Sequence, residues 1–137
     1  MSRGLRNCNP GNIRRSRTRY EGEVVPSGDS QFKQFESMGY GYRAMFVLLD
    51  TYRRRYGLTT IRQMLNRYAP PAENFTEGYV RLVSQQTGIA PDECLDTRSQ
   101  RDMVPMVAAM SRVENGVAAV MADVEQGWQL FAAGLKP

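Results

Sequence analysis

The sequence has no histidine among its 137 residues. That absence excludes the Ser-His-Asp and Cys-His arrangements, in which an imidazole activates a hydroxyl or thiol nucleophile. It also argues against a zinc site, because the only two cysteines, Cys8 and Cys94, cannot hold zinc alone. Catalysis must then use carboxylates, Tyr, Arg or a bound cofactor. Since carboxylate chemistry needs neither, we expect no metal and no cofactor.

Long apolar runs and lysine are scarce as well. No apolar run approaches the roughly 20 residues of a membrane helix, and residues 1–6 lack the apolar stretch of a signal peptide. We therefore expect no membrane span and synthesis in the cytoplasm without a leader, so a target in the periplasm or cell wall would require delivery by another agent. Two lysines stand against sixteen arginines, and the net charge is +4. This balance suits a polyanionic partner, either a nucleic acid or an anionic cell-wall polymer.

The length and composition predict one soluble globular domain over residues 1–137. Its first feature is the run Arg3–Ile13, which holds three Asn, two Gly and one Pro. Gly and Asn tolerate positive φ, and Asn side chains bond to nearby backbone, so a tight polar loop is expected. A plain turn before the first strand is the alternative.

The rest of the chain predicts a mainly α (α+β) fold, with about six helices and one small β-hairpin. The hairpin is expected over residues 18–35, around the turn Pro26–Asp29. Apolar spacing, capping residues and Pro or Gly breaks predict the following helical segments: 37–57, 59–70, one that begins at a capping box at Asn74, a single helical turn at 91–93, 97–113, and a last helix carrying Val117 to Phe131.

One carboxylate lies on an apolar helix face. The stripe of Met103, Val107 and Met110 continues to Glu114, just before the helix is broken at Asn115-Gly116. Partial burial would raise the pKa of Glu114, as a general acid requires. The alternative is a frayed helix end with Glu114 in water.

Several short motifs occur together in this chain: residues 4–13, 20–22, Phe32 with Phe35, 41–44, 68–71, Glu73-Asn74 and Thr76 with Tyr79. In combination they resemble those of small phage and prophage proteins that are often labelled virion structural protein. These proteins are similar to the murein-lytic enzyme of cystoviruses, which has a lysozyme-like fold.

A second resemblance is to the flagellar-type glucosaminidases of the lysozyme superfamily. There a helix ends in a catalytic Glu followed by Ser-Gly, and the chain continues with Asn-Leu-Phe-Gly-Ile, a hairpin, and a Phe-x-x-Tyr segment that leads into a helix with an inward Ala. Residues 9–13, the hairpin and the Ala44 helix look like that order with its first helix missing. Residues 108–116 look like the missing helix, although Asn115 stands where that family has Ser. The resemblance implies a circularly permuted lysozyme-like fold, in which Glu114 lies beside the opening loop.

The resemblance implies a peptidoglycan-degrading glycosidase of the muramidase or lytic transglycosylase type, which cleaves the β-1,4 glycan bond. Glu114 would protonate the glycosidic oxygen. The second group would be a hairpin carboxylate, Glu23 first and then Glu21 or Asp29, which activates water. Without such a carboxylate, a hydroxyl or acetamido group of the substrate would complete the reaction and leave an anhydro sugar.

Six residues are predicted to bind substrate. Arg6, Asn9 and Asn12 would line the cleft and bond to acetamido or hydroxyl groups. Tyr68 and Tyr79 would be sugar platforms, with core packing as the alternative for both. Glu73 belongs to the same set, with a role at a helix N-terminus as its alternative.

The expected partner is peptidoglycan, with a phage particle, holin or secretion machine for delivery, or an immunity protein, as further partners. A peptidoglycan endopeptidase is one alternative function, although such peptidases usually need the His that this chain lacks. A non-enzymatic virion or nucleic-acid-binding protein is the other. Its arginines would contact phosphates, but they are scattered without aromatic interleaving or a single basic face.

Overall fold

The computed structural model describes residues 1–135 and is mainly helical, as predicted. Within these residues, no helix is both long and apolar enough to cross a membrane. The elements are α1 (Arg3–Arg6), β1 (Glu23–Val24), β2 (Gln34–Phe35), α2 (Met38–Tyr56), α3 (Ile61–Tyr68), α4 (Thr76–Thr87), α5 (Gln100–Asn115) and α6 (Met121–Ala133).

Helix α2 forms the centre of the core and has the bounds that its sequence predicts. The Ser37 side chain caps its N-terminus, and Gly57, with a φ of 67°, ends it in the left-handed conformation. Its apolar face packs against α6, where the ring of Phe46 lies 5.1 Å from Trp128 and 6.1 Å from Phe131. This aromatic cluster fixes α6 across α2.

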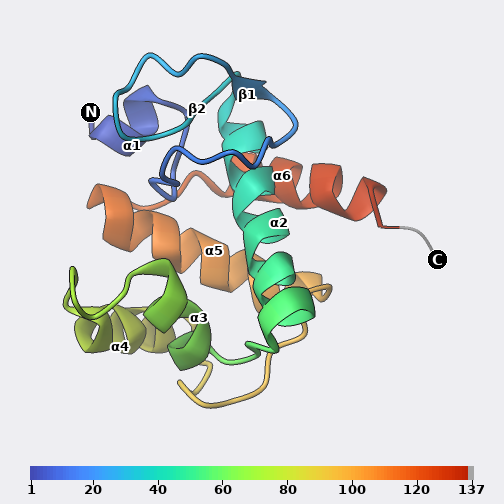
Figure 1. The fold of residues 1–137 in the computed structure, drawn as a ribbon. Helices are drawn as coiled ribbons and strands as arrows, with labels where there is room; N and C mark the ends of the chain where they lie inside the picture. Colours follow the sequence, from blue (N-terminus) through green and yellow to red (C-terminus); the bar gives the residue numbers. More distant parts are fainter. Residues whose placement is uncertain (136–137) are drawn as a thin grey trace.

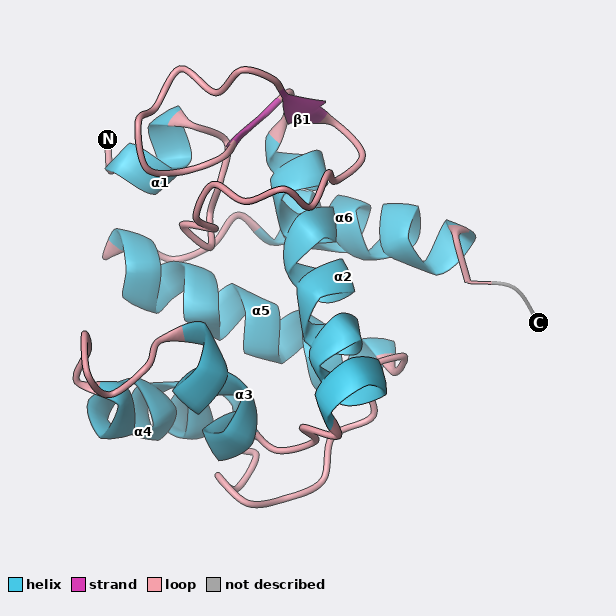
Figure 2. Cartoon of the chain, in the orientation of Figure 1, coloured by secondary structure: helices cyan, strands magenta, loops and turns pink. Residues whose placement is uncertain are grey.

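Figure 1 shows how α5 divides the molecule. Helix α5 crosses the middle, with α1 and the hairpin on one side and α3 and α4 on the other. The C-terminal end of α5 lies near α1, so the first and last parts of the fold meet there. Figure 2 shows that long loops join the few strand residues of the upper part.

Two predicted helix starts are wrong. The capping box at Asn74 does not form, because the Asn74 amide donates to the carbonyl of Pro70 and α4 begins at Thr76 without a side-chain cap. Helix α5 is capped by Ser99 rather than Thr97. The Thr97 hydroxyl is buried and donates to Asp50 instead.

Four further expectations are corrected. Residues 91–93 form a turn and no helix. Val117 and Val120 are exposed and precede α6. The opening run begins with the single-turn helix α1, and its tight part follows, where Cys8 and Asn12 both have a φ of 49°. The short strands pair Glu23 with Phe35, and the loop of residues 25–33 replaces the predicted tight turn.

Asp50 lies in the core, although most carboxylates of globular proteins lie at the surface. Its carboxylate is 3% exposed and accepts bonds from Thr97 at 2.8 Å and Arg54 at 3.0 Å, with Arg98 at 3.5 Å. Burial raises the pKa of Asp50, but the bonds from Thr97, Arg98 and Arg54 outweigh it, so the pKa is lowered. The charged carboxylate therefore ties α2 to the segment that precedes α5.

Replacing Asp50 with Asn is expected to lower the free energy of unfolding by about 1–2 kcal/mol at pH 6, since charge-assisted bonds are lost and the two arginines are half-exposed. The folded-state pKa of Asp50 lies below the ordinary value of 3.8, so the stabilisation is present above that pH and is lost as the pH falls through the folded-state pKa. Urea unfolding of parent and variant at pH 6 and pH 3 measures this. A difference that does not shrink at pH 3 would contradict it.

Candidate active site

Glu114 lies in the last turn of α5, half-buried against the opening loop. Its Oε1 accepts a hydrogen bond from the Asn12 amide at 2.9 Å, and its Oε2 accepts one from the Tyr79 hydroxyl at 2.9 Å. The prediction that this helix brings Glu114 beside the opening loop is confirmed by the bond to Asn12. Both carboxylate oxygens are thus held in fixed positions.

The environment of Glu114 favours its protonated form. Burial raises the pKa of the carboxyl, and the bonds from Asn12 and Tyr79, which favour the charged form, offset this only in part. The Tyr79 hydroxyl stays a neutral donor, because its own burial and the nearby Glu114 carboxylate raise its pKa well above the ordinary value. The pKa of Glu114 is thus shifted in the direction that suits a proton donor.

Asn115, the neighbour of Glu114, attaches the opening loop to α5. Its amide nitrogen donates to the carbonyl of Pro10 at 2.8 Å, and its oxygen accepts from the Ser2 hydroxyl at 2.7 Å. The loop approaches so closely that a Cβ on Gly4 would lie 2.6 Å from the Asn115 oxygen. Sequence reasoning treated Asn115 as a helix breaker, and no spacing rule indicated this role.

A groove of about 340 Å³ opens beside Glu114. The opening loop and the start of the hairpin form one wall, and α2 with the end of α3 and the following turn forms the other. The lining residues are Gly11, Asn12, Ile13, Arg14, Phe32, Leu48, Tyr52, Tyr68, Ala69, Pro70, Glu73, Asn74 and Glu114. Four of the predicted site residues therefore share this groove: Asn12, Tyr68, Glu73 and Glu114.

Asn9 and Arg6 do not line the groove, and these two predictions are wrong. Asn9 is fully buried, where its amide donates to the carbonyls of Ile13 and Lys33 and its oxygen accepts from the Ile13 amide. The tight loop needs these bonds to satisfy its own backbone. Arg6 points away on α1, and its guanidinium donates to the carbonyl of Met1.

The two predicted sugar platforms have different positions. Tyr68 lines the groove, with its hydroxyl donating to the carbonyl of Gly11. Tyr79 is 8% exposed and lies on the buried face of α4 beside Val80 and Val83, so it offers no ring face to a sugar. Its prediction as a platform is wrong, because the helical spacing that singled it out turns it inward, where it holds Glu114.

The hairpin acids do not face Glu114, so their prediction as a second catalytic group is wrong. Glu23 forms a 2.9 Å ion pair with Lys33, whose side chain is 1% exposed and needs a counter-charge. Glu21 is 60% exposed and lies 3.3 Å from Arg43 on α2. Neither residue lines the groove.

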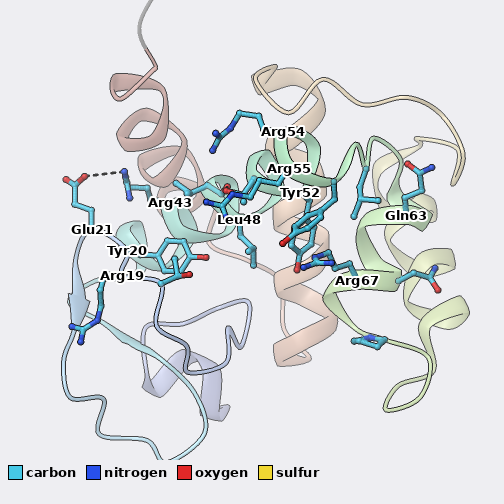
Figure 3. A pocket seen from close by; sticks show the side chains of 17 residues that line it. Arg19, Tyr20, Glu21, Arg43, Leu48, Tyr52, Arg54, Arg55, Gln63 and Arg67 are labelled. Atoms are coloured by element: carbon cyan, nitrogen blue, oxygen red, sulfur yellow. Dashed lines mark hydrogen bonds and ion pairs between the residues drawn. The ribbon is translucent and has the colours of Figure 1, made fainter.

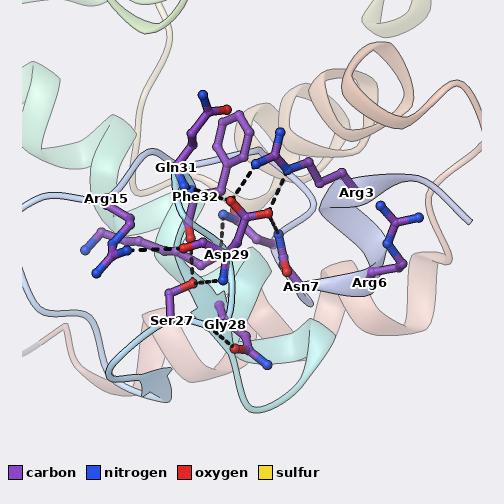
Figure 4. A network of polar contacts seen from close by, with 12 residues as sticks. Arg3, Arg6, Asn7, Arg15, Ser27, Gly28, Asp29, Gln31 and Phe32 are labelled. Atoms are coloured by element: carbon purple, nitrogen blue, oxygen red, sulfur yellow. Dashed lines mark hydrogen bonds and ion pairs between the residues drawn. The ribbon is translucent and has the colours of Figure 1, made fainter.

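Asp29 organises the long hairpin loop instead (Figure 4). Its carboxylate accepts bonds from Arg3 and Asn7 and from the backbone amides of Gln31 and Phe32. The Arg3 guanidinium and these amides hold the pKa of Asp29 far below its ordinary range. The permanently charged Asp29 thereby joins the hairpin loop to α1.

Sequence reasoning missed Phe32, Arg14 and Tyr52 as groove residues. The guanidinium of Arg14 lies 5.6 Å from the centre of the Phe32 ring, which places a stacked cation on the groove wall. The Phe32-x-x-Phe35 motif could have indicated Phe32 as a groove residue, because Phe35 is buried in the core and Phe32 is partly exposed. Within residues 1–135, no three His, Cys, Asp or Glu side chains lie close enough to share a metal ion.

Replacing Tyr79 with Phe is expected to shift the pH dependence of any reaction that uses Glu114 as an acid. Because the Tyr79 bond lowers the pKa of Glu114, its loss should raise that pKa further and move the alkaline limb of kcat/KM to higher pH. Looser positioning should also cost about tenfold in the maximal rate.

The matched control is Tyr42→Phe, which removes a buried hydroxyl bonded to Ser111 at 2.8 Å, outside the groove. A pH–rate profile of both variants makes the comparison. If the two profiles are the same, Tyr79 does not act through Glu114.

Comparison with known proteins identifies a phage relative. Over 118 residues the chain is 36% identical to Protein P5 of Pseudoalteromonas phage PM2, and the match covers 84% of this chain and 72% of Protein P5. No protein-family model matches the chain. The similarity to Protein P5 therefore extends over most of both chains.

Proposed function

The chain belongs to the family of Protein P5 of Pseudoalteromonas phage PM2, and we propose that it is a peptidoglycan-degrading glycosidase that cleaves the β-1,4 glycan bond. One observation carries the proposal: Glu114, with a raised pKa, lines a groove while two donors fix its oxygens. A carboxyl group in this state is suited to protonate the glycosidic oxygen as the sugar ring gains positive charge.

A permuted lysozyme-like fold is part of the same proposal. Its support is the junction between α5 and the opening loop, where Asn12 and Glu114 bond across 102 residues of sequence. In the glucosaminidase order, the Glu helix would come directly before that Asn-rich segment. A circular permutation would keep the Glu114 helix and the opening loop adjacent in space, although their order along the chain differs.

The mechanism that fits best uses Glu114 without a second hairpin carboxylate. Each of the three hairpin carboxylates forms an ion pair: Glu21 with Arg43, Glu23 with Lys33, and Asp29 with Arg3. Glu114 would then act twice: as the acid that protonates the leaving oxygen, and as the base that assists a substrate hydroxyl in closing an anhydro ring. This favours the lytic transglycosylase type over a muramidase.

Glu73 is the other carboxylate on the groove wall, and it tests this mechanism. Replacing Glu73 with Gln is expected to reduce the rate less than about tenfold, because no step requires its charge. Mass spectrometry of digested purified sacculi should show anhydro sugar ends with both parent and variant. New reducing ends, together with a loss of activity in the variant of about a hundredfold or more, would make Glu73 a water-activating base.

The same digest separates the alternative functions. Free peptide amines without new glycan ends would indicate the endopeptidase and overturn the glycosidase proposal. Because a phage protein belongs to the same family, we propose a phage particle or a holin as the means of delivery to the cell wall. Action in the periplasm or wall belongs to the same proposal.

A further inference from the structure

A second and larger cavity, of about 1030 Å³, lies between residues 18–21, the outer face of α2 and α3. Figure 3 shows side chains from all three segments turned toward it. Five arginines line it, against the single carboxylate of Glu21. Those arginines are Arg19, Arg43, Arg54, Arg55 and Arg67. The cavity is therefore strongly cationic, although the arginines are dispersed in the sequence.

The cavity continues the Glu114 groove. Leu48, Tyr52 and Pro70 line both spaces, so one wall is common to them. Tyr52 is 8% exposed, and burial raises its pKa to about 12, so it adds no negative charge to this wall. The cationic cavity is therefore adjacent to the groove beside Glu114.

Several of the cavity's positive charges are available to a ligand. Arg43 is paired with Glu21 at 3.3 Å and Arg54 with Asp50 at 3.0 Å. Within residues 1–135, Arg19, Arg55 and Arg67 form no ion pair with a carboxylate.

Two of the cavity's guanidinium groups have features that favour a planar anion. The Arg67 guanidinium lies 3.6 Å from the centre of the Tyr56 ring, which positions it while leaving its N–H groups free to donate. The Nε of Arg43 is buried without an acceptor. Arg67 thus offers oriented donors to an anionic ligand, while the Arg43 Nε is left without an acceptor inside the protein.

We propose that this cavity binds the carboxylates of peptidoglycan peptide stems while the glycan strand lies in the Glu114 groove. The inference rests on the proposed function. Guanidinium groups match carboxylates with paired N–H donors, and the stems are the carboxylate-rich branches nearest the glycan bond. The cavity thus selects glycan strands that still carry peptides, and it holds them next to Glu114.

The test combines a double variant with two substrates. Arg55→Gln with Arg67→Gln removes two cavity cations. Arg53→Gln with Arg101→Gln removes two exposed cations that line neither space. Each protein is assayed on sacculi and on the same glycan after an amidase has stripped the stems. The cavity variant is expected to show a roughly tenfold higher KM on sacculi, with an unchanged kcat and no change on stripped glycan. Equal losses on both substrates, or equal losses in the two variants, would overturn the inference.

A binding measurement keeps this inference separate from the glycosidase proposal. A free stem tetrapeptide and its carboxyl-amidated form are titrated into the full chain by calorimetry, which requires no catalysis. The cavity variant and the amidated peptide should each bind at least about tenfold more weakly than parent with free peptide. Binding of the free peptide by an inactive parent would refute the glycosidase alone. Tighter binding of duplex DNA than of peptide, abolished in the cavity variant, would assign the cavity to phosphates and overturn the inference.

Discussion

Replacing Glu114 with Gln is expected to reduce lysis of purified sacculi by about 10²–10⁴-fold, because the amide has no acidic proton to give the leaving oxygen. Gln has nearly the same shape, and its single amide oxygen can accept the bond that Asn12 donates, while its NH2 group can donate to the Tyr79 hydroxyl oxygen. The groove should therefore keep its form, and KM should change little. Turbidity loss and released sugar ends measure the rate.

The stability of the same variant provides an internal control. Because the folded-state pKa of Glu114 is raised above 4.5, its ionisation costs the parent stability as the pH rises from that value. The Gln variant avoids this cost. The free energy of unfolding of the variant, relative to that of the parent, should therefore increase between pH 4 and pH 7. A folded variant that still lyses sacculi at the parent rate would refute the role of Glu114.

Replacing Gly41 with Ala is expected to lower the free energy of unfolding by about 2–3 kcal/mol and to impair lysis. A Cβ at this position of α2 would collide with the carbonyl oxygen of Cys8 and lie 2.6 Å from the Pro10 ring. The first contact is with backbone, which cannot rotate away, so the opening loop must shift. That shift would separate Asn12 from Glu114.

Gly134→Ala is the matched control, since its Cβ would lie 3.4 Å from the Phe131 carbonyl, which is much less crowded. Urea unfolding and sacculus lysis of both variants give the two measurements. If Gly41→Ala is as stable and as active as the control, the close packing of α2 on the loop does not set the site geometry.

The helical part of the fold could be predicted because its signals are local. Ser37 and Gly57 bound α2, Thr60 begins α3, and Gly116 ends α5, each through a cap that depends on neighbouring residues. The inward position of Glu114 also followed from local periodicity. Its contact with Asn12 required the resemblance as well, since no local pattern joins residues 102 positions apart.

The orientation of the carboxylate side chains on the hairpin could not be predicted, because it depends on partners that lie far along the chain. Glu23 turns toward Lys33 and Asp29 toward Arg3, and both choices depend on the loop path between the strands. Asn9 was misread for a related reason. The same carboxamide can bind a ligand or satisfy its own loop, and only the buried backbone of residues 9–13 decides between them.

The hydrogen bonds that join Asn115 to Pro10 and Ser2 link the end of α5 to the start of the chain, so they can form only late in synthesis on the ribosome. The segment carrying Asn12 emerges early, but the acid that it orients emerges only about a hundred residues later. Until the end of α5 leaves the exit tunnel, a nascent chain cannot form the bond between Asn12 and Glu114. Under the proposed function, any product terminated before residue 114 would lack the proton donor, and the producing cell would be spared its lytic activity.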